Sequence, residues 1–495
     1  MDLLLDALER HYGWSDFRPG QRPVVECLLH GQDCLAVLPT GGGKSLCYQL
    51  PALVRSGLVV VISPLVALME DQVLQLRRRG IAAACVHGGI EPVQRRETLT
   101  QLSEGSLRLL YLAPERLQGD ATRSLLQEHA AAGQLVALAV DEAHCISAWG
   151  HDFRPDYRRL GELRALCPGV PMVALSATAA PRVRADILRL LHLRRPLIQV
   201  GSARRHNLHY AMRRRVGDPL QDVVDALDNA RGACLIYART RISVERWTER
   251  LCANGVHAIA YHAGLEPEVR HRALEHFLEA EDPVLVATVA FGMGVDRADV
   301  GLVLHLDLPS TPEGYLQESG RAGRDGKPAQ CLVLFSPRDR TRLGWAMQSA
   351  LRRTSSVNAA EEARRIELAQ QQLRRMEAVA EGETCREQAL LLSVGELVPP
   401  CGRCDRCQSS ASRQDWSDEA TAVLELLAEV HGVDARSLSE RLNSAEGRSA
   451  HWGWLTRRLV QEELIHETDD GSQRLFLKES GRRFLRQPWP LHYAA

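Results

Sequence analysis

Short apolar runs that recur between helical stretches are the feature that most constrains the fold of this chain. Runs such as Leu58–Ile62 and Leu135–Val140 are rich in valine, leucine and isoleucine, and amphipathic segments separate them. This alternation is typical of a parallel β-sheet flanked by helices. It returns over residues 232–335, beginning with Ala233–Tyr237. We therefore expect two α/β domains joined by an arginine-rich linker at residues 204–216. The remaining expected strands are Cys34–Leu38, Leu107–Leu112, Met172–Leu175, His257–Tyr261, Val284–Ala287, Leu302–Leu306 and Gln330–Phe335.

Beyond the second α/β region the apolar pattern becomes helical. Arginine density rises over residues 339–380, and a compact region with one turn signal at Asp469–Gly471 ends the sequence. Residues two positions apart do not share a helix face, so only one of Trp452 and Trp454 is expected in a core. Helices are expected at residues 418–430, 435–442 and 450–465, and a hairpin at residues 469–477.

The composition is that of a folded protein rather than a disordered one. Hydrophobic residues make up 45% of the 495 residues, charged residues make up 25%, and the formal net charge is -1. Any nucleic-acid site must therefore arise from local clustering of positive charge. The longest apolar run, Leu58–Met69, is interrupted by Ser63 and Pro64 and is too short to span a bilayer, and the first ten residues lack a signal-peptide pattern. We expect a cytoplasmic protein that does not enter a membrane.

A glycine-rich segment, Leu38–Ser45, follows an expected strand and precedes an expected helix. In a phosphate-binding loop, glycines let backbone N–H groups approach phosphate, a lysine neutralises the terminal phosphates, and a hydroxyl group binds Mg²⁺. Lys44 and Ser45 stand at the positions for the last two roles, and Lys44 is one of only three lysines in the chain. The alternative is an ordinary glycine-rich turn, which the retained lysine argues against.

Two acidic residues, Asp141 and Glu142, follow the expected strand at residues 135–140. At the carboxyl edge of a parallel sheet they would face the phosphate loop, where Asp141 would hold Mg²⁺ and Glu142 would polarise an attacking water. Such a pair alone is usually a surface turn, but here it accompanies the loop at Lys44. Ser176–Thr178 follow the next strand, and their small hydroxyl groups are suited to relay a change at the phosphates.

Two arginines, Arg321 and Arg324, lie three residues apart in a glycine-containing segment. At this spacing they are expected to share one face of a helix and to reach a γ-phosphate across a cleft between the two α/β domains. In a chain so rich in arginine, the alternative is a solvated pair. Just upstream, residues 288–296 have the pattern of a loop suited to contact phosphate or nucleotide, although Phe291 and Met293 fit a core equally well.

Four of the thirteen cysteines lie close together in the sequence. Cys385 is expected on a helix, and Cys401, Cys404 and Cys407 follow a Pro-Pro turn at CxxC spacing. Four such thiolates are suited to one tetrahedral Zn²⁺ and leave no open position for a catalytic water. We therefore expect a structural zinc site that holds a helical hairpin next to the C-terminal domain. The other nine cysteines are scattered singly, as buried free thiols usually are.

Together these motifs resemble the RecQ DNA helicases of superfamily 2, over nearly the whole chain. The segments that carry the resemblance, in order, are Tyr12–Gln21, Thr40–Ser45, Ser63–Leu65, Ala113–Arg116, Asp141–His144, Ser176–Thr178, Tyr261–Leu265, Thr288–Asp296 and Gln317–Arg324. The resemblance implies an α/β fold with two RecA-like parallel-sheet motor domains at residues 1–205 and 206–340. A helical zinc-binding domain at residues 341–410 and a winged-helix domain at residues 411–495 would follow. It also implies an ATP-dependent DNA helicase that moves 3′ to 5′ on single strands, with ATP, Mg²⁺ and Zn²⁺ as cofactors.

The resemblance also implies roles for individual residues. Gln21 would read the adenine edge, while Trp14 and Arg18 would sandwich the base. The segment after His144 is similar to the aromatic-rich loop of the family, which couples single-stranded DNA to ATP hydrolysis. Its coupling residues would be Trp149, His151, Phe153 and Arg154. The nucleotide-binding residues would be Trp14, Arg18, Gln21, Thr40, Gly41, Gly42, Gly43, Lys44, Ser45 and Asp141, and the catalytic residues would be Lys44, Asp141, Glu142, Arg321 and Arg324. Read without the family, Trp14, Trp149 and Phe153 would be assigned to a core.

The sequence departs from the family pattern at a few positions. Val379 stands where an aromatic residue is usual, and Ser393–Glu396 stands where Tyr-Phe-Gly-Glu is usual, which changes the expected packing near the zinc site but not the metal ligands. The expected wing is short and carries Asp469 and Asp470, and acidic residues are poorly suited to contact phosphate. We therefore do not expect strand separation by a long pin, nor do we expect the HRDC domain that many relatives carry.

Three other functions fit parts of the sequence. A DNA-stimulated ATPase could remodel DNA without unwinding it well, and a DNA-binding scaffold could carry a vestigial motor. An RNA helicase is suggested by Asp141–His144, but the zinc and winged-helix modules favour DNA. The expected partners are single-stranded and forked or partially duplex DNA and a single-strand-binding protein, for a monomer that serves recombination and repair.

Overall fold

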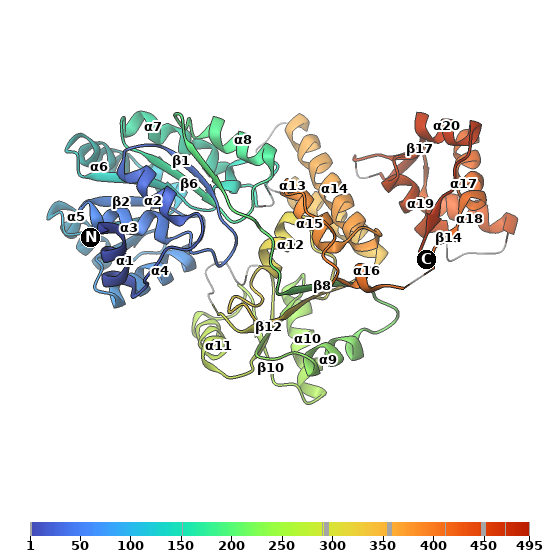
Figure 1. The fold of residues 1–495 in the computed structure, drawn as a ribbon, viewed down its shortest axis with the longest axis horizontal. Helices are drawn as coiled ribbons and strands as arrows, with labels where there is room; N and C mark the ends of the chain where they lie inside the picture. Colours follow the sequence, from blue (N-terminus) through green and yellow to red (C-terminus); the bar gives the residue numbers. More distant parts are fainter. Residues whose placement is uncertain are drawn as a thin grey trace.

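A seven-stranded parallel sheet forms the N-terminal part of the molecule (Figure 1). The computed structural model describes residues 2–150, 152–289, 291, 297–353, 359–410, 412–446, 452–470 and 472–494. The strands, in the order β3-β4-β2-β5-β6-β1-β7, are β1 (Cys34–Val37), β2 (Leu58–Ile62), β3 (Ala83–Val86), β4 (Leu109–Leu112), β5 (Leu135–Val140), β6 (Met172–Ser176) and β7 (Leu197–Val200). The five predicted strands are present. The edge strands β3 and β7 were not predicted, because each exposes part of its side chains and lacks a continuous apolar run.

Helices cover both faces of this sheet, as the crossovers between parallel strands require. Alternate residues of β1 enter separate cores, since Leu35 and Val37 pack into one cluster and Cys34 and Ala36 into another. The helices are α1 (Leu3–Tyr12), α2 (Gln21–Leu29), α3 (Leu46–Val54), α4 (Val66–Arg78), α5 (Pro92–Ser103), α6 (Asp120–Ala131), α7 (Leu163–Leu166) and α8 (Pro181–Leu190), with short 3₁₀ helices η1 (Pro114–Gln118), η2 (Ala143–Ile146) and η3 (Pro155–Glu162).

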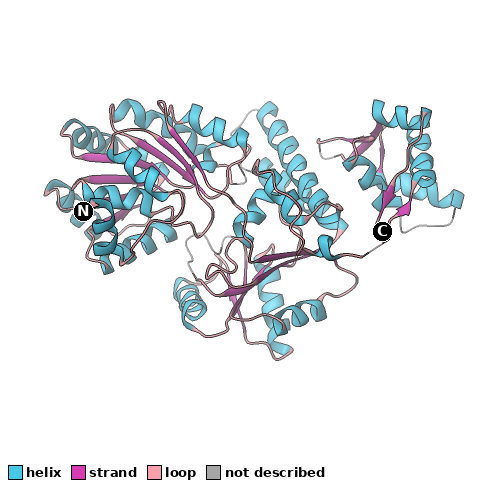
Figure 2. Ribbon diagram, in the orientation of Figure 1, coloured by secondary structure: helices cyan, strands magenta, loops and turns pink. Residues whose placement is uncertain are grey.

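A second parallel sheet follows, with six strands in the order β10-β11-β9-β12-β13-β8 (Figure 2). Its strands are β8 (Leu208–Arg214), β9 (Ala233–Tyr237), β10 (Ala258–Tyr261), β11 (Val284–Ala287), β12 (Val300–His305) and β13 (Ala329–Phe335). Its helices are α9 (Leu220–Asp228), α10 (Arg241–Ala253), α11 (Pro267–Glu279) and α12 (Pro312–Ser319). The expected linker at residues 204–216 is wrong in part, because most of it is β8, which pairs with β13 along its whole length. Exposed residues such as His209 and Arg213 conceal the strand pattern.

Two long helices, α13 (Pro337–Arg353) and α14 (Ala359–Glu381), pack against each other after the second sheet. Figure 1 shows this hairpin between the first sheet and the C-terminal region. The short helices α15 (Arg386–Ser393) and α16 (Asp405–Gln408) follow. Cys385 immediately precedes α15, so the expectation that it stands on a helix is wrong by one position.

The C-terminal region is a small helical unit with two short antiparallel sheets. The elements are β14 (Gln414–Asp415), α17 (Ser417–Glu429), β15 (Val433–Asp434), α18 (Ala435–Glu446), α19 (Trp452–Gln461), β16 (Ile465–Glu467), β17 (Arg474–Leu477), α20 (Glu479–Arg486) and β18 (His492–Tyr493). The hairpin of β16 and β17 begins earlier than predicted. Trp452 is buried, whereas Trp454 is partly exposed and contacts Trp416 at 5.0 Å between ring centroids, as the prediction of one core Trp requires. Among the described residues, no helix has the length and apolar character needed to cross a bilayer.

Candidate functional site

The glycine-rich segment forms a tight loop between β1 and α3, as predicted. Gly41 and Gly43 have φ angles of +77° and +71°, which glycine adopts without strain. A Cβ atom at Gly42 would lie 2.8 Å from the carbonyl oxygen of Pro39, so a larger residue does not fit there. The loop leads through Lys44 into the N-terminus of α3, an arrangement that favours bound anions.

Gln21 is fully buried beside this loop. Its side-chain nitrogen donates hydrogen bonds to the carbonyl oxygens of Gly42 and Gly43, at 3.1 and 2.9 Å. Arg18 donates a hydrogen bond to the carbonyl oxygen of Gly41, and its guanidinium carbon lies 5.8 Å from the ring centroid of Trp14. The three residues expected to hold adenine are thus gathered at the phosphate loop. Arg18 and Trp14 contact each other, so they would have to separate before a base could lie between them.

Asp141 and Glu142 are buried directly after β5. Glu142 has a φ angle of +46°, a strained conformation that is common at functional sites. Burial and the charge of Glu142 raise the pKa of Asp141 to about 7, while Lys44 opposes this rise. The opposing effect of Lys44 shows that the phosphate loop and the acidic pair are electrostatically coupled. A divalent cation bound here would relieve the repulsion between the two carboxylates, so the site fits Mg²⁺.

His144 links the acidic pair to β6. Its Nδ1 atom lies 3.0 Å from Ser176 Oγ and 3.3 Å from Glu142 Oε2. Ser176 in turn donates a hydrogen bond to the carbonyl oxygen of Thr178 at 2.7 Å. Burial opposes protonation of His144, but the neighbouring Cys145 and Glu142 raise its pKa to about 10. A chain of polar contacts therefore joins the acidic pair to the segment that was predicted to relay changes at the phosphates.

Arg324 approaches the phosphate loop from the second sheet, but neither Arg321 nor Arg324 lies on a helix. Helix α12 ends at Ser319, and both arginines belong to the turn that follows. The predicted shared helix face is therefore wrong. Gly323, with a φ angle of +53°, turns the chain between the two arginines.

The turn after α12 brings the two sheets together at the phosphate loop. A Cβ atom built at Gly41 would lie 3.5 Å from Cγ of Arg324, and one built at Gly320 would lie 3.2 Å from Cβ of Thr40. The Nε atom of Arg321 is buried and has no hydrogen-bond partner among the described residues. A buried guanidinium of this kind suits an anionic ligand.

In the segment after His144, the aromatic rings of Trp149 and Phe153 lie next to arginine side chains. The guanidinium carbon of Arg182 lies 3.4 Å from the ring centroid of Trp149. Phe153 has two such neighbours, Arg158 at 5.0 Å and Arg365 at 5.1 Å. Both rings are partly exposed, so the alternative of a purely core role does not hold. His151 lies outside the described residues.

Arg154 anchors the same loop to two other segments. It donates a hydrogen bond to the carbonyl oxygen of Pro64 at 2.6 Å and pairs with Asp152 at 3.1 Å. A cavity of about 390 Å³ lies between this loop and the end of α12. Asp152 and Arg154 line one side, and the other side includes Gln317 and Arg321. The loop is therefore close to the arginine turn.

The segment at residues 288–296 was expected to form a loop that contacts nucleotide or to contribute to a core. Phe291 is buried in the core, and Met293 lies outside the described residues.

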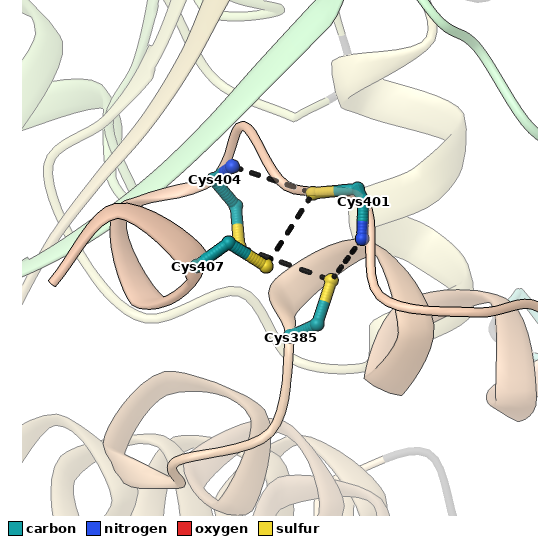
Figure 3. Close-up of side chains that lie close together, drawn as sticks. All are labelled: Cys385, Cys401, Cys404 and Cys407. Atoms are coloured by element: carbon teal, nitrogen blue, oxygen red, sulfur yellow. Dashed lines mark hydrogen bonds between the residues drawn. The ribbon is translucent and has the colours of Figure 1, made fainter.

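The four clustered cysteines converge as predicted (Figure 3). All four sulfur atoms lie within 4.8 Å of one another, and the pairs Cys401–Cys407 and Cys385–Cys404 are 4.0 and 3.9 Å apart. Zinc–sulfur bonds of about 2.3 Å in a tetrahedron place sulfur atoms about 3.8 Å apart, so the cluster fits Zn²⁺. Arg403 and Asp405, which lie between the cysteines in the sequence, form hydrogen bonds with the edge strand β8 of the second sheet. Arg403 donates a hydrogen bond to the carbonyl oxygen of Leu208 at 3.1 Å, and Asp405 accepts one from the backbone N–H of Met212 at 3.0 Å.

Comparison with known proteins agrees with this geometry. Residues 18–187 match the DEAD/DEAH box helicase family, residues 218–326 match the helicase conserved C-terminal domain, and residues 337–408 match the RecQ zinc-binding family. The chain is 35% identical to the ATP-dependent DNA helicase RecQ of Haemophilus influenzae, over 99% of this chain and 81% of that protein. The chain belongs to the RecQ helicase family.

Other relatives support the same assignment. The ATP-dependent DNA helicase RecQ of Bacillus subtilis is 37% identical, over 97% of this RecQ chain and 83% of that protein. The solved structure of Mycobacterium smegmatis helicase Lhr bound to ssDNA and AMP-PNP has a TM-score of 0.57 and 19% identity, over 98% of this chain and 61% of that one, which shows a shared fold. As a RecQ helicase, this chain is an ATP-dependent enzyme that unwinds DNA, uses ATP with Mg²⁺, and carries a zinc-binding region with four cysteines.

Sequence reasoning missed two arginines of this RecQ site. Arg182 on α8 and Arg365 on α14 contact the rings of the loop that follows His144. Neither belongs to a recognised motif. Because all but three of the 61 basic Lys and Arg residues are arginines, no compositional signal marks these two. Only the folded chain brings them to the aromatic rings.

Proposed function

We propose that this helicase hydrolyses ATP at the junction of its two parallel sheets and moves 3′ to 5′ along single-stranded DNA. The loop Thr40–Ser45, with Trp14, Arg18 and Gln21, would hold the nucleotide. Ser45 and Asp141 would hold Mg²⁺, which supplies charge neutralisation for phosphoryl transfer. Glu142 would orient the attacking water. The catalytic set is completed by Lys44, Arg321 and Arg324.

The contact between Gly41 and Arg324 carries this proposal. An arginine presented by one domain to nucleotide held by another stabilises transition-state charge only while the domains are closed. The contact therefore supports a cycle in which opening and closing of the junction accompany hydrolysis. The aromatic-rich loop with Trp149, His151, Phe153 and Arg154 would couple bound DNA to this junction, since Arg154 of the loop lines the cavity beside Arg321.

ATP hydrolysis, measured with and without single-stranded DNA, tests the proposal. We expect DNA to stimulate turnover many-fold in the unsubstituted chain, and Lys44→Ala and Glu142→Gln to abolish it. Lys327→Ala is the matched control, because this lysine is largely exposed and pairs only loosely with Asp325 at 3.5 Å. A chain without DNA-stimulated turnover would contradict the motor mechanism and favour a binding scaffold. Stimulation by RNA in place of DNA would favour an RNA helicase.

We further propose four domains, at residues 1–205, 206–340, 341–410 and 411–495, the last being a winged helix that binds duplex DNA at a fork. Three helices and the hairpin of β16 and β17 support this interpretation. The DNA substrate supports a location in the bacterial cytoplasm, associated with the nucleoid, and a role in recombination and repair. We propose a monomer that meets single-strand-binding protein on its substrate.

One observation favours a second candidate, a DNA-stimulated ATPase that remodels DNA but unwinds it poorly. Two acidic residues of the β16–β17 hairpin are engaged within the molecule, since Glu467 pairs with Arg340 and Asp469 pairs with Arg374 at 2.5 Å. A hairpin held in this way is not free to separate strands. Unwinding of a forked duplex, compared with hydrolysis stimulated by single-stranded DNA, distinguishes the two functions.

A further inference from the structure

Phe153 contacts an arginine that lies outside both parallel sheets. Arg158, at 5.0 Å, belongs to η3 and follows Phe153 closely in the chain. Arg365, at 5.1 Å, lies 212 positions further on, in α14. A guanidinium near an aromatic face gains from the ring quadrupole. Arg365 therefore ties the aromatic-rich loop of the first domain to the long helix that precedes the zinc site.

Helix α14, which carries Arg365, is held at its C-terminal end by ion pairs. Its 23 residues span about 35 Å at 1.5 Å per residue. Near its C-terminal end, Glu381 accepts two hydrogen bonds from Arg457 of the C-terminal region, at 2.8 and 2.7 Å. Glu377 is buried beside Arg340 at 3.4 Å. Because buried ion pairs hold one end of the helix, Arg365 near the other end is held at a defined place.

The contact competes with DNA for the same ring. A base that stacks on Phe153 needs a free face of the ring, and stacking on aromatic side chains is the usual way in which proteins hold single strands. Arg158 and Arg365 both lie near the ring, so a base that stacks on the face beside Arg365 must displace its guanidinium. The contact with Arg365 and the stacking of a base on the same face of the ring therefore exclude each other, and a contact made in only one of two states shifts the balance toward that state.

We propose that Arg365 is a positioning residue that holds the aromatic-rich loop through its contact with Phe153, so that ATP hydrolysis stays slow until a base of single-stranded DNA takes the place of the guanidinium on the ring. The proposal rests on the proposed coupling role of this loop. Arg154 of the same loop is bonded to Pro64 and lines the cavity beside Arg321, so a shift of the loop is transmitted toward the arginine turn.

The test measures ATP hydrolysis without DNA and with saturating single-stranded DNA, for Arg365→Ala, Arg365→Met and Arg365→Lys. Methionine keeps much of the side-chain length without the charge, so it remains informative if the alanine variant is unstable. We expect the alanine and methionine variants to hydrolyse ATP several-fold faster without DNA, with a smaller fold stimulation by DNA. Lysine should restore most of the stimulation, because it keeps a cation near the ring. The exposed neighbour Arg364→Ala is the control and should behave as the unsubstituted chain.

A double-variant comparison shows whether Arg365 acts through Phe153. In a Phe153→Ala background, Arg365→Ala should change the DNA-free rate no further. Equal DNA-free rates for Arg365→Ala and Arg364→Ala, or full additivity with Phe153→Ala, would overturn the proposal. Failure of the proposed motor mechanism would look different, because the unsubstituted chain itself would then show no stimulation of ATP hydrolysis by DNA.

Discussion

Two junctions in this molecule are built from opposite kinds of residue. The junction between the parallel sheets brings small residues together, with Thr40 beside Gly320 and Gly41 beside the side chain of Arg324. The junction between the α13–α14 hairpin and the C-terminal region is made of buried opposite charges, among them Arg340 with Glu467 and Arg457 with Glu381. Small residues leave space that a ligand can fill, whereas buried ion pairs lose much when they separate. The first junction is suited to open and close, and the second to stay closed.

The largest expected effect comes from breaking the first junction at its catalytic contact. Arg324→Ala removes the guanidinium that reaches the phosphate loop, and an arginine in this role contributes about 10³-fold or more to turnover. We expect kcat for DNA-stimulated ATP hydrolysis to fall by about that factor while the melting temperature changes little. Steady-state kinetics and thermal unfolding measure the two quantities. A large loss of stability with unchanged kcat would show that Arg324 is structural.

The second junction should respond in stability rather than in chemistry. Arg340→Met leaves Glu467 and Glu377 buried with less compensating charge, and removing one partner of a buried pair costs about 3–5 kcal/mol in the free energy of unfolding. Chemical denaturation measures this loss. Arg436→Met is the matched control, because Arg436 pairs with Glu440 on an exposed helix face and should show no measurable change. An equal loss in the free energy of unfolding for Arg340→Met and Arg436→Met would show that the buried pairs contribute no more than the exposed pair.

A smaller effect concerns the pH dependence of the same junction. Burial raises the pKa of Glu377 to about 7, although Arg340 and Arg457 oppose the rise. A carboxyl group with a higher pKa in the folded chain than in the unfolded chain binds its proton more tightly when folded, so its contribution to stability decreases as pH rises between the two pKa values. As pH rises from about 5 to about 8, we expect the free energy of unfolding to fall less for Glu377→Gln than for the unsubstituted chain. Thermal unfolding across this range checks the difference, and parallel curves would contradict it.

The same contrast explains what the sequence could and could not predict. The phosphate loop, the acidic pair and the four cysteines are local patterns, so their positions follow from spacing, and the long buried strands follow from apolar runs. Edge strands such as β7 and β8 have partly exposed side chains and leave no such signal. The predicted helix face for Arg321 and Arg324 failed because Gly320 and Gly323 favour a turn. The ion pairs of the second junction were not predictable, because charged residues are usually exposed and nothing in the sequence marks the few that become buried.

The zinc-binding segment also closes an exposed sheet edge. Strand β8 is the last strand of the second sheet, and the backbone groups of Leu208 and Met212 are bonded to Arg403 and Asp405, the residues interleaved between the zinc-binding cysteines. An uncovered edge strand is a template for pairing with other chains. Loss of the metal would loosen these two side chains and uncover β8. We therefore expect bound zinc to lower the tendency of this helicase to aggregate, and chelation to increase light scattering before it slows ATP hydrolysis.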